Sequence, residues 1–211
     1  MKNIDWKLCL IADPDLVNED KLIPKVEEAV EAGVTLVQLR VKSLSTRKFL
    51  ELAIPLSALL RKKNIPFLVN DRVDIALVSQ ASGVHLGQDD LPLPYARKIL
   101  GPDKIIGISV HNLEEALTAE KKGADYLGAG PVFPTSSKKD LSPLLGLEGI
   151  RLIREKTHLP ILAIGGIKPE NASAVIAAGA DGVAAISAFF QKKDVRLVSG
   201  EFKQALSRQP D

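Results

Sequence analysis

The chain has 211 residues, enough for one large domain or two small ones, and a chain of this length can bury roughly 70% of its unfolded surface. Apolar residues make up 45% of the sequence and aromatic residues only 4%, which favours packed aliphatic layers over an aromatic recognition surface. The formal net charge of +2 argues against a general nucleic-acid-binding role, because such a role needs a clustered excess of Lys and Arg.

Neither a membrane span nor a disulfide is expected. No segment approaches the roughly 18 consecutive apolar residues of a membrane-spanning helix, and the N-terminal stretch carries too many charges for a signal peptide. Cys9 is the one cysteine, and its place in the apolar run LCLIAD predicts a buried, inert thiol. We therefore expect a cytoplasmic protein.

Strand-like and helix-like segments alternate along the chain. Short apolar runs bounded by Gly, Pro or Asp predict eight strands, in chain order at residues 8–13, 35–40, 66–71, 83–87, 104–110, 125–130, 160–166 and 182–187. Segments with one apolar helical face lie between them, most clearly at residues 20–33, 45–64, 112–123 and 168–179. Gly33, Gly123 and Gly179 end three of these segments and are expected to adopt the left-handed conformation of a helix C-terminus.

Repeated βα units over the whole chain predict a single-domain (β/α)8 TIM barrel that spans residues 1–211. A doubly wound open sheet is the main alternative, but it usually has fewer strands and a topological switch point. No linker or low-complexity tract divides the chain. In TIM barrels the functional site lies at the carboxyl ends of the strands, so the residues that end the strands are the candidates.

The residues that end the predicted strands are polar, charged or glycine. They are Asp13; Gln38, Arg40 and Lys42; Asn70 and Asp71; Gln88, Asp89 and Asp90; Ser109 and His111; Thr135, Ser136, Ser137 and Lys138; Gly165 and Gly166; and Ser187. In an extended segment, Gln38, Arg40 and Lys42 share one face, while Leu39 and Val41 share the other. We expect the polar set to meet at one end of the barrel.

Two carboxylates follow successive strands and suggest a metal site. Asp71 and Asp90 offer the oxygen ligands that Mg²⁺ prefers, since this ion is usually held by one or two carboxylates together with substrate phosphates. Helix or turn capping is the alternative role for each residue taken alone. Asp89 could replace its neighbour Asp90 as the ligand.

Three cations on the same rim suggest a diphosphate site. Arg40 offers a bidentate fork, and Lys42 and Lys138 add two point charges. Solvated surface charge is the alternative for the two lysines. Arg40 follows an apolar run, so a barrel strand would bury its charge unless an anion met it.

A second, metal-free phosphate site is expected at the last two strands. Gly165 and Gly166 follow the seventh strand, where backbone N–H groups can approach an anion, although these glycines could also simply form the turn. His85 and His158 lack partners at metal-ligand spacing and are expected to be structural. The role of His111 stays open, because Asn112 beside it is a natural helix N-cap.

Seven segments in this order resemble the thiamine phosphate synthase family: QLRVK, LVNDRVDIA, GVHLGQDD, GISVH, GPVFPTSSKKD, AIGGI and GVAAIS. The resemblance covers nearly the whole chain and implies a TIM-barrel enzyme. It also implies transfer of an aminopyrimidine methylene group from its diphosphate to the nitrogen of a thiazole phosphate, with release of pyrophosphate. Any single segment, such as IGGI, occurs in many phosphate-binding barrels.

The resemblance also implies residue roles. The diphosphate would contact Gln38, Arg40, Lys42, Asn70 and Lys138. Mg²⁺ would bind Asp71 and Asp90, and Ser109 would contact the pyrimidine. The thiazole phosphate would lie against Thr135, Ser136, Ser137, Gly166, Ile186 and Ser187. Arg40, Lys138 and Ser109 are the catalytic candidates, the partners are small molecules, and a homodimer is an expectation from the resemblance alone.

The chain departs from the family pattern at two positions. Ser137 stands where members often carry Thr, and Val41 stands where they often carry Glu. Two other functions remain open. One is a thiazole tautomerase-like barrel, although such relatives carry His at the position where this chain has Pro131 in the segment GPVF. The other is a non-catalytic barrel that binds phosphometabolites.

Overall fold

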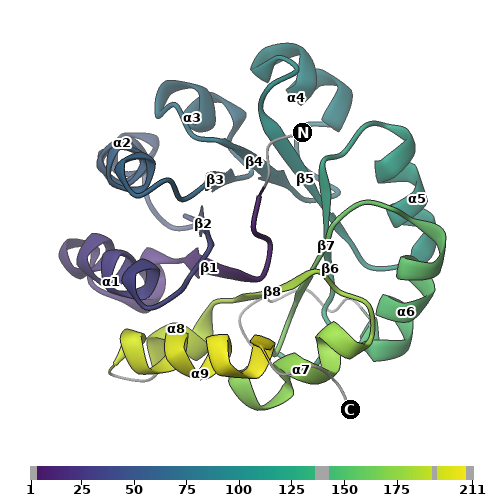
Figure 1. Cartoon of the computed structure of the whole chain (residues 1–211). Coiled ribbons are helices and arrows are strands. Elements are labelled where there is room, and N and C mark those ends of the chain that lie inside the picture. The colour runs from purple at the N-terminus through teal and green to yellow at the C-terminus, as the bar shows by residue number, and fades with distance from the viewer. Residues whose placement is uncertain (1–3, 136–142, 192–193, 208–211) are drawn as a thin grey trace.

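The computed structural model describes residues 4–135, 143–191 and 194–207. Within these residues, parallel strands close into an eight-stranded barrel in chain order, as Figure 1 shows along the barrel axis. The strands are β1 (Leu8–Ala12), β2 (Leu36–Leu39), β3 (Phe67–Asn70), β4 (Gly83–Leu86), β5 (Ile105–Val110), β6 (Tyr126–Ala129), β7 (Ile161–Ile164) and β8 (Gly182–Ala185). The predicted (β/α)8 barrel is confirmed, and each strand lies within its predicted segment.

Helices surround the barrel in Figure 1. They are η1 (Pro14–Leu16), α1 (Glu19–Glu31), α2 (Thr46–Lys62), α3 (Val73–Val78), α4 (Leu93–Leu100), α5 (Leu113–Lys121), α6 (Gly146–Lys156), α7 (Pro169–Ala177), α8 (Ser187–Gln191) and α9 (Val195–Ser207). The last helix, α9, packs against both α7 and α1 and so closes the ring. None of the helices in the described part of the chain combines the length and apolar character needed to cross a bilayer.

Three glycines end helices as the sequence predicts. Gly33, Gly123 and Gly179 follow the last residues of α1, α5 and α7 with φ angles of 118°, 87° and 105°. A residue with a side chain is strained in this conformation, whereas glycine reaches it cheaply. The glycines therefore set where each helix stops and the chain turns back toward the next strand.

The strands bury two separate sets of side chains. Outward residues such as Val37 and Leu39 pack against the helices, while inward residues such as Cys9, Ile11 and Leu36 form a second cluster inside the barrel. Cys9 is a free thiol inside the barrel, which confirms its expected burial, and burial raises the pKa of this thiol. Period-two alternation along each strand produces this separation, and it aims the alternate polar residues into the barrel or its rim.

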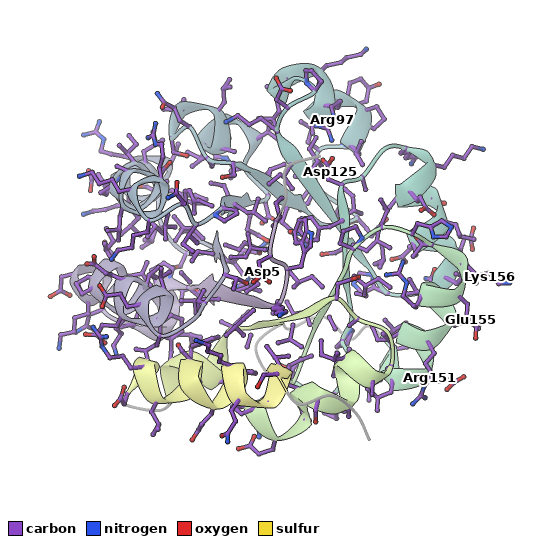
Figure 2. All side chains as sticks on the ribbon, viewed as in Figure 1. Asp5, Arg97, Asp125, Arg151, Glu155 and Lys156 are labelled. Atoms are coloured by element: carbon purple, nitrogen blue, oxygen red, sulfur yellow. The ribbon has the colours of Figure 1, made fainter. Side chains whose placement is uncertain are left out.

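Residues 4–7 pass across the amino-terminal end of the barrel before β1, where Figure 2 labels Asp5. The Asp5 carboxylate accepts a hydrogen bond of 3.0 Å from the backbone N–H of Lys7. Trp6 packs against the inner cluster, with its ring centroid 4.7 Å from that of Tyr126. The segment thus covers the inner cluster at the end of the barrel opposite the strand carboxyl ends.

The same arrangement of an ion pair and a backbone hydrogen bond occurs at two places around the barrel. Asp125, just before β6, pairs with Arg97 of α4 at 2.6 Å and accepts a bond from the N–H of Ile106 in β5 (Figure 2). Asp181, just before β8, pairs with Arg154 of α6 at 3.0 Å and accepts from the first N–H of β7. Each aspartate therefore joins a helix end to the start of a neighbouring strand.

Candidate functional site

The first wall of the candidate site comes from β1 and β2. The Arg40 guanidinium lies 2.5 Å from the Asp13 carboxylate, and both side chains are largely buried. The other oxygen of Asp13 accepts a 3.0 Å bond from the N–H of Asp15 and caps η1. The sequence left the role of Asp13 open. In the structure it holds Arg40 at the rim.

Lys42 and Gln38 share the predicted face with Arg40, but their surroundings differ. Lys42 is half-exposed, and its ammonium lies 2.6 Å from the carboxylate of Asp71. Gln38 is buried within β2 and hydrogen-bonds to Tyr126 inside the barrel. Val41 packs in the outer core, as alternation predicts. The strand therefore presents two cations at the rim and one amide deeper inside.

The carboxyl groups of Asp71 and Asp90 lie within hydrogen-bonding reach of each other. The pKa of Asp90 is raised, first by burial and then by the neighbouring Asp71 carboxylate. Asp90 also accepts a 2.6 Å bond from the N–H of Gly87. Two carboxylates this close repel each other when both are ionised, and a divalent cation between them would remove that repulsion.

The capping alternatives have different outcomes for the two aspartates. Helix α3 begins at Val73 with Arg72 as its N-cap and has no side-chain capping bond, so Asp71 does not cap it. Asp71 instead adopts a left-handed φ of 63°, which aspartate tolerates better than most residues do. Asp90 does stabilise a turn through Gly87, as the alternative expected. Asp89 is exposed.

The donor set suits magnesium better than a softer metal. No group of three or more His, Cys, Asp or Glu side chains that could hold a metal occurs among the residues described by the structure. Two carboxylates alone would hold Mg²⁺ weakly, yet this ion commonly takes its remaining ligands from water and substrate phosphates. The pair of Asp71 and Asp90 fits a magnesium site that is completed by water and substrate phosphates.

A pocket forms the second wall of the site, on the side of β5 to β8, and its empty space, including the part open to solvent, is about 690 Å³. Five of its residues are among the predicted contacts: Ser109, Thr135, Gly166, Ile186 and Ser187. The remaining lining residues are His111, Gly128, Gly130, Pro131, Ile164, Gly165, Ile167, Ala184 and Ala185.

Both the backbone conformation and the available space require glycine at the two positions after β7. Gly165 and Gly166 have φ angles of 98° and 64°. A Cβ atom on Gly166 would lie 2.6 Å from the backbone oxygen of Pro134, and one on Gly165 would lie 2.6 Å from the Cα atom of Pro131. The turn interpretation is therefore correct, and the same turn brings bare backbone to the pocket wall.

His85 is buried inside the barrel rather than placed at its rim. Its Nδ1 atom lies 2.7 Å from the Tyr126 hydroxyl, and its Nε2 atom lies 2.9 Å from the Ser109 hydroxyl. Ser109 in turn lines the pocket. The sequence spacing predicted a structural role for His85, and no sequence pattern indicated Tyr126. The available signal was an ionisable residue between two outward apolar neighbours in a strand.

The other two histidines differ from His85. His111 lines the pocket, and its Nδ1 atom lies 2.9 Å from the carboxylate of Glu115. Asn112 accepts a bond from the N–H of Glu115 and caps α5, as expected. His158 is exposed in the loop before β7. Glu115 thus fixes the His111 ring at the edge of the pocket.

Four of the residues to which the resemblance gives a role remain to be placed. Asn70 is buried at the end of β3, on the rim beside Asp71. Ser136, Ser137 and Lys138 lie outside the described residues. Thr135, which precedes them, lines the pocket, so the described chain reaches the site immediately before this segment.

Comparisons with known proteins find relatives that are similar over nearly the whole chain. A family model described as thiamine monophosphate synthase matches residues 8–189. A thiamine-phosphate synthase of Clostridium novyi is 50% identical over 197 residues, which cover 93% of this chain and 97% of that protein. A thiamine-phosphate synthase of Syntrophomonas wolfei is 47% identical over 208 residues, with coverage of 99% and 100%. The solved thiamine phosphate pyrophosphorylase of Pyrococcus furiosus has a TM-score of 0.88 at 45% identity and covers 96% of each chain.

Proposed function

Because the chain belongs to the thiamine monophosphate synthase family, we propose that it is a thiamine phosphate synthase. It transfers the aminopyrimidine methylene group from its diphosphate to the ring nitrogen of the thiazole phosphate. The carbon–oxygen bond to the diphosphate breaks, a carbon–nitrogen bond forms, and pyrophosphate leaves. One observation carries the proposal: cations and paired carboxylates on β1 to β4 face the same rim as a pocket on β5 to β8.

The proposed diphosphate region is the β1 to β4 side of the rim. Arg40 and Lys42 offer positive charge there, and Asn70 adds an amide. Lys138 and Gln38 complete the set by resemblance to the family. In the structure both rim cations are paired with carboxylates, so an arriving diphosphate would compete with Asp13 for Arg40 and with Asp71 for Lys42. This arrangement keeps the cations ordered before the substrate binds.

Asp71 and Asp90 are the proposed magnesium ligands. Their contact and the raised pKa of Asp90 support a site that is incomplete without a cation. Bound Mg²⁺ would supply positive charge to the oxygens of the departing pyrophosphate. Lys42 already places a positive charge against Asp71, and it would be free to meet the diphosphate once that carboxylate had another partner.

The proposed thiazole phosphate region is the pocket on β5 to β8. Gly166, Ile186 and Ser187 line it where TIM barrels recurrently bind phosphate, after the seventh and eighth strands. Thr135 lines the same pocket, and Ser136 and Ser137 are assigned by resemblance. The bare backbone at Gly166 allows a phosphate to approach more closely than a side chain would permit.

The residues support dissociation of the diphosphate rather than covalent catalysis by the protein. An electron-rich aminopyrimidine can stabilise a methylene cation, so the protein must hold the departing anion and align the thiazole nitrogen. Arg40 and Lys138 would stabilise the leaving charge, and Ser109 would orient the pyrimidine. No protein nucleophile is needed for this reaction.

The two alternative functions make different demands on these residues. A thiazole tautomerase-like enzyme has no need of Asp71, Asp90 and Arg40 around a diphosphate, and this chain has Pro131 where the tautomerase motif has His. A non-catalytic barrel would bind phosphometabolites without turnover. We also propose a cytoplasmic location and, by resemblance, a homodimer.

The deciding experiment combines the purified protein with pyrimidine diphosphate, thiazole phosphate and Mg²⁺. Thiamine phosphate and pyrophosphate should form in equal amounts, and omission of either substrate should stop both. Absence of both products with all three components present would contradict the synthase proposal. Isomerisation of the thiazole phosphate alone would support the tautomerase, and binding without any product would support the non-catalytic barrel.

A further inference from the structure

We propose that His85 is a positioning residue that fixes the Ser109 hydroxyl as a hydrogen-bond donor facing the substrate pocket. The proposal rests on the proposed function, because the pyrimidine is the ligand expected beside Ser109. The chain of contacts runs along the inside of the barrel. Tyr126 in β6 lies 2.7 Å from one ring nitrogen of His85 in β4, and Ser109 in β5 lies 2.9 Å from the other.

The direction of these hydrogen bonds follows from Tyr126. The pKa of its hydroxyl is raised well above the ordinary value, chiefly by complete burial, so the group stays protonated. The Gln38 amide donates to the Tyr126 oxygen. The tyrosine proton is then directed to His85, and we assign Nδ1 as the acceptor from this network.

This assignment determines where the protons of His85 and Ser109 lie. A neutral imidazole that accepts at Nδ1 carries its proton on Nε2. His85 therefore donates to the Ser109 oxygen across the 2.9 Å contact. With its oxygen engaged as an acceptor, Ser109 presents its own O–H to the pocket. The matching substrate atom is an acceptor, such as an unprotonated pyrimidine ring nitrogen.

Two glycines leave the space inside the barrel that the rings of Tyr126 and His85 occupy. A Cβ atom on Gly107 would lie 2.0 Å from the Tyr126 ring, and one on Gly128 would lie 2.5 Å from the His85 ring. Both glycines face inward from the neighbouring strands β5 and β6. An interior lined mainly by apolar side chains thus accommodates two large polar rings whose polar atoms are hydrogen-bonded.

Two substitutions at His85 separate the two contacts. In His85→Gln the amide nitrogen can reach the place of Nε2 and donate to Ser109, whereas in His85→Asn the shorter amide can reach only the Tyr126 side. We expect His85→Asn to lower kcat/KM for the pyrimidine diphosphate about tenfold, the effect of one lost hydrogen bond, and His85→Gln to lose less. KM for the thiazole phosphate should stay unchanged. His158→Asn, the same change at an exposed histidine, is the control.

A double-variant comparison tests whether His85 acts through Ser109. In a Ser109→Ala background, His85→Asn should cause little further loss, because the hydroxyl that it orients is already absent. Equal losses in both backgrounds would overturn the proposal, since a general structural role affects both equally. A rise in KM for both substrates together would also overturn it.

Nitrogen-15 NMR of the histidine rings tests the tautomer directly and requires no activity. The sequence has three histidines, and the signals missing from His85→Gln assign the one of interest. We expect neutral His85 protonated at Nε2 in the protein without substrates. A proton on Nδ1, or on both nitrogens, would overturn the proposal. This result is independent of product formation, so failure of the synthase assignment would be recognised separately.

Discussion

Replacement of Asp13 by Asn separates the charge of the buried Asp13–Arg40 pair from the shape of its side chain. The amide keeps an oxygen that can accept from the N–H of Asp15, so the cap of η1 can persist. The amide brings no negative charge to the Arg40 guanidinium, which lies 2.5 Å from the native carboxylate. Arg40 is then left as a nearly buried cation without its aspartate partner.

The expected cost follows from the exposure of the two side chains. Removing one partner of a fully buried ion pair destabilises a protein by about 3–5 kcal/mol, because the remaining charge stays desolvated. The Asp13 side chain is 5% exposed but that of Arg40 is 15% exposed, so water can solvate part of the remaining cation. We therefore expect Asp13→Asn to lower the free energy of unfolding by about 2–3 kcal/mol. Asp13→Ala should lose about 1 kcal/mol more, since it also removes the cap.

Urea unfolding of the substrate-free protein measures this loss, with Glu148→Gln as the matched control. Glu148 pairs with Arg151 at 3.0 Å, but both side chains are at least half exposed, so the control should unfold close to the wild type. An Asp13→Asn variant as stable as Glu148→Gln would show that the Asp13 charge does not stabilise the fold through Arg40.

Three other predictions concern the carboxylates and the glycine turn. Asp71→Asn should reduce turnover strongly and raise the Mg²⁺ requirement with the fold intact, and wild-type kinetics would contradict the metal assignment. The raised pKa of Asp90 means that the folded protein without metal loses stability as pH rises from the ordinary range of a carboxyl through the raised value. Asp90→Asn removes that loss, so urea unfolding near neutral pH without divalent ions should show a variant at least as stable as the wild type; a less stable variant would contradict this sign. Gly166→Ala should destabilise the protein by at least about 1 kcal/mol, through its φ of 64° and the contact with Pro134, and should weaken thiazole phosphate binding measured by calorimetry.

Local sequence patterns were enough to predict the barrel. Each strand is a short apolar run, and glycines such as Gly33 stop the helices at the expected places. Alternation correctly separated Arg40 from Val41, because side-chain direction in a strand depends only on position parity. The rim could therefore be predicted, since the fold brings all strand carboxyl ends together.

Contacts across the barrel could not be predicted in the same way. Asp13 and Arg40 are 27 residues apart, and His85 and Tyr126 are 41 residues apart. Such pairs depend on strand register and on barrel closure, which no local pattern encodes. The position of Gln38 could not be predicted for the same reason. Alternation predicts which face its side chain lies on, but not that this side chain contacts Tyr126 below the rim.

The covering segment at the amino-terminal end of the barrel gives this protein an internal optical reporter. Trp6 is the one tryptophan in the sequence, and its ring lies against Tyr126, which contacts His85 and through it Ser109 at the pocket. Tryptophan emission therefore arises at a single point, at the opposite end of this contact chain from the ligand. A change in that emission when the pyrimidine diphosphate binds would show, without any attached dye, that binding at the carboxyl ends of the strands alters the packing at the opposite end of the barrel.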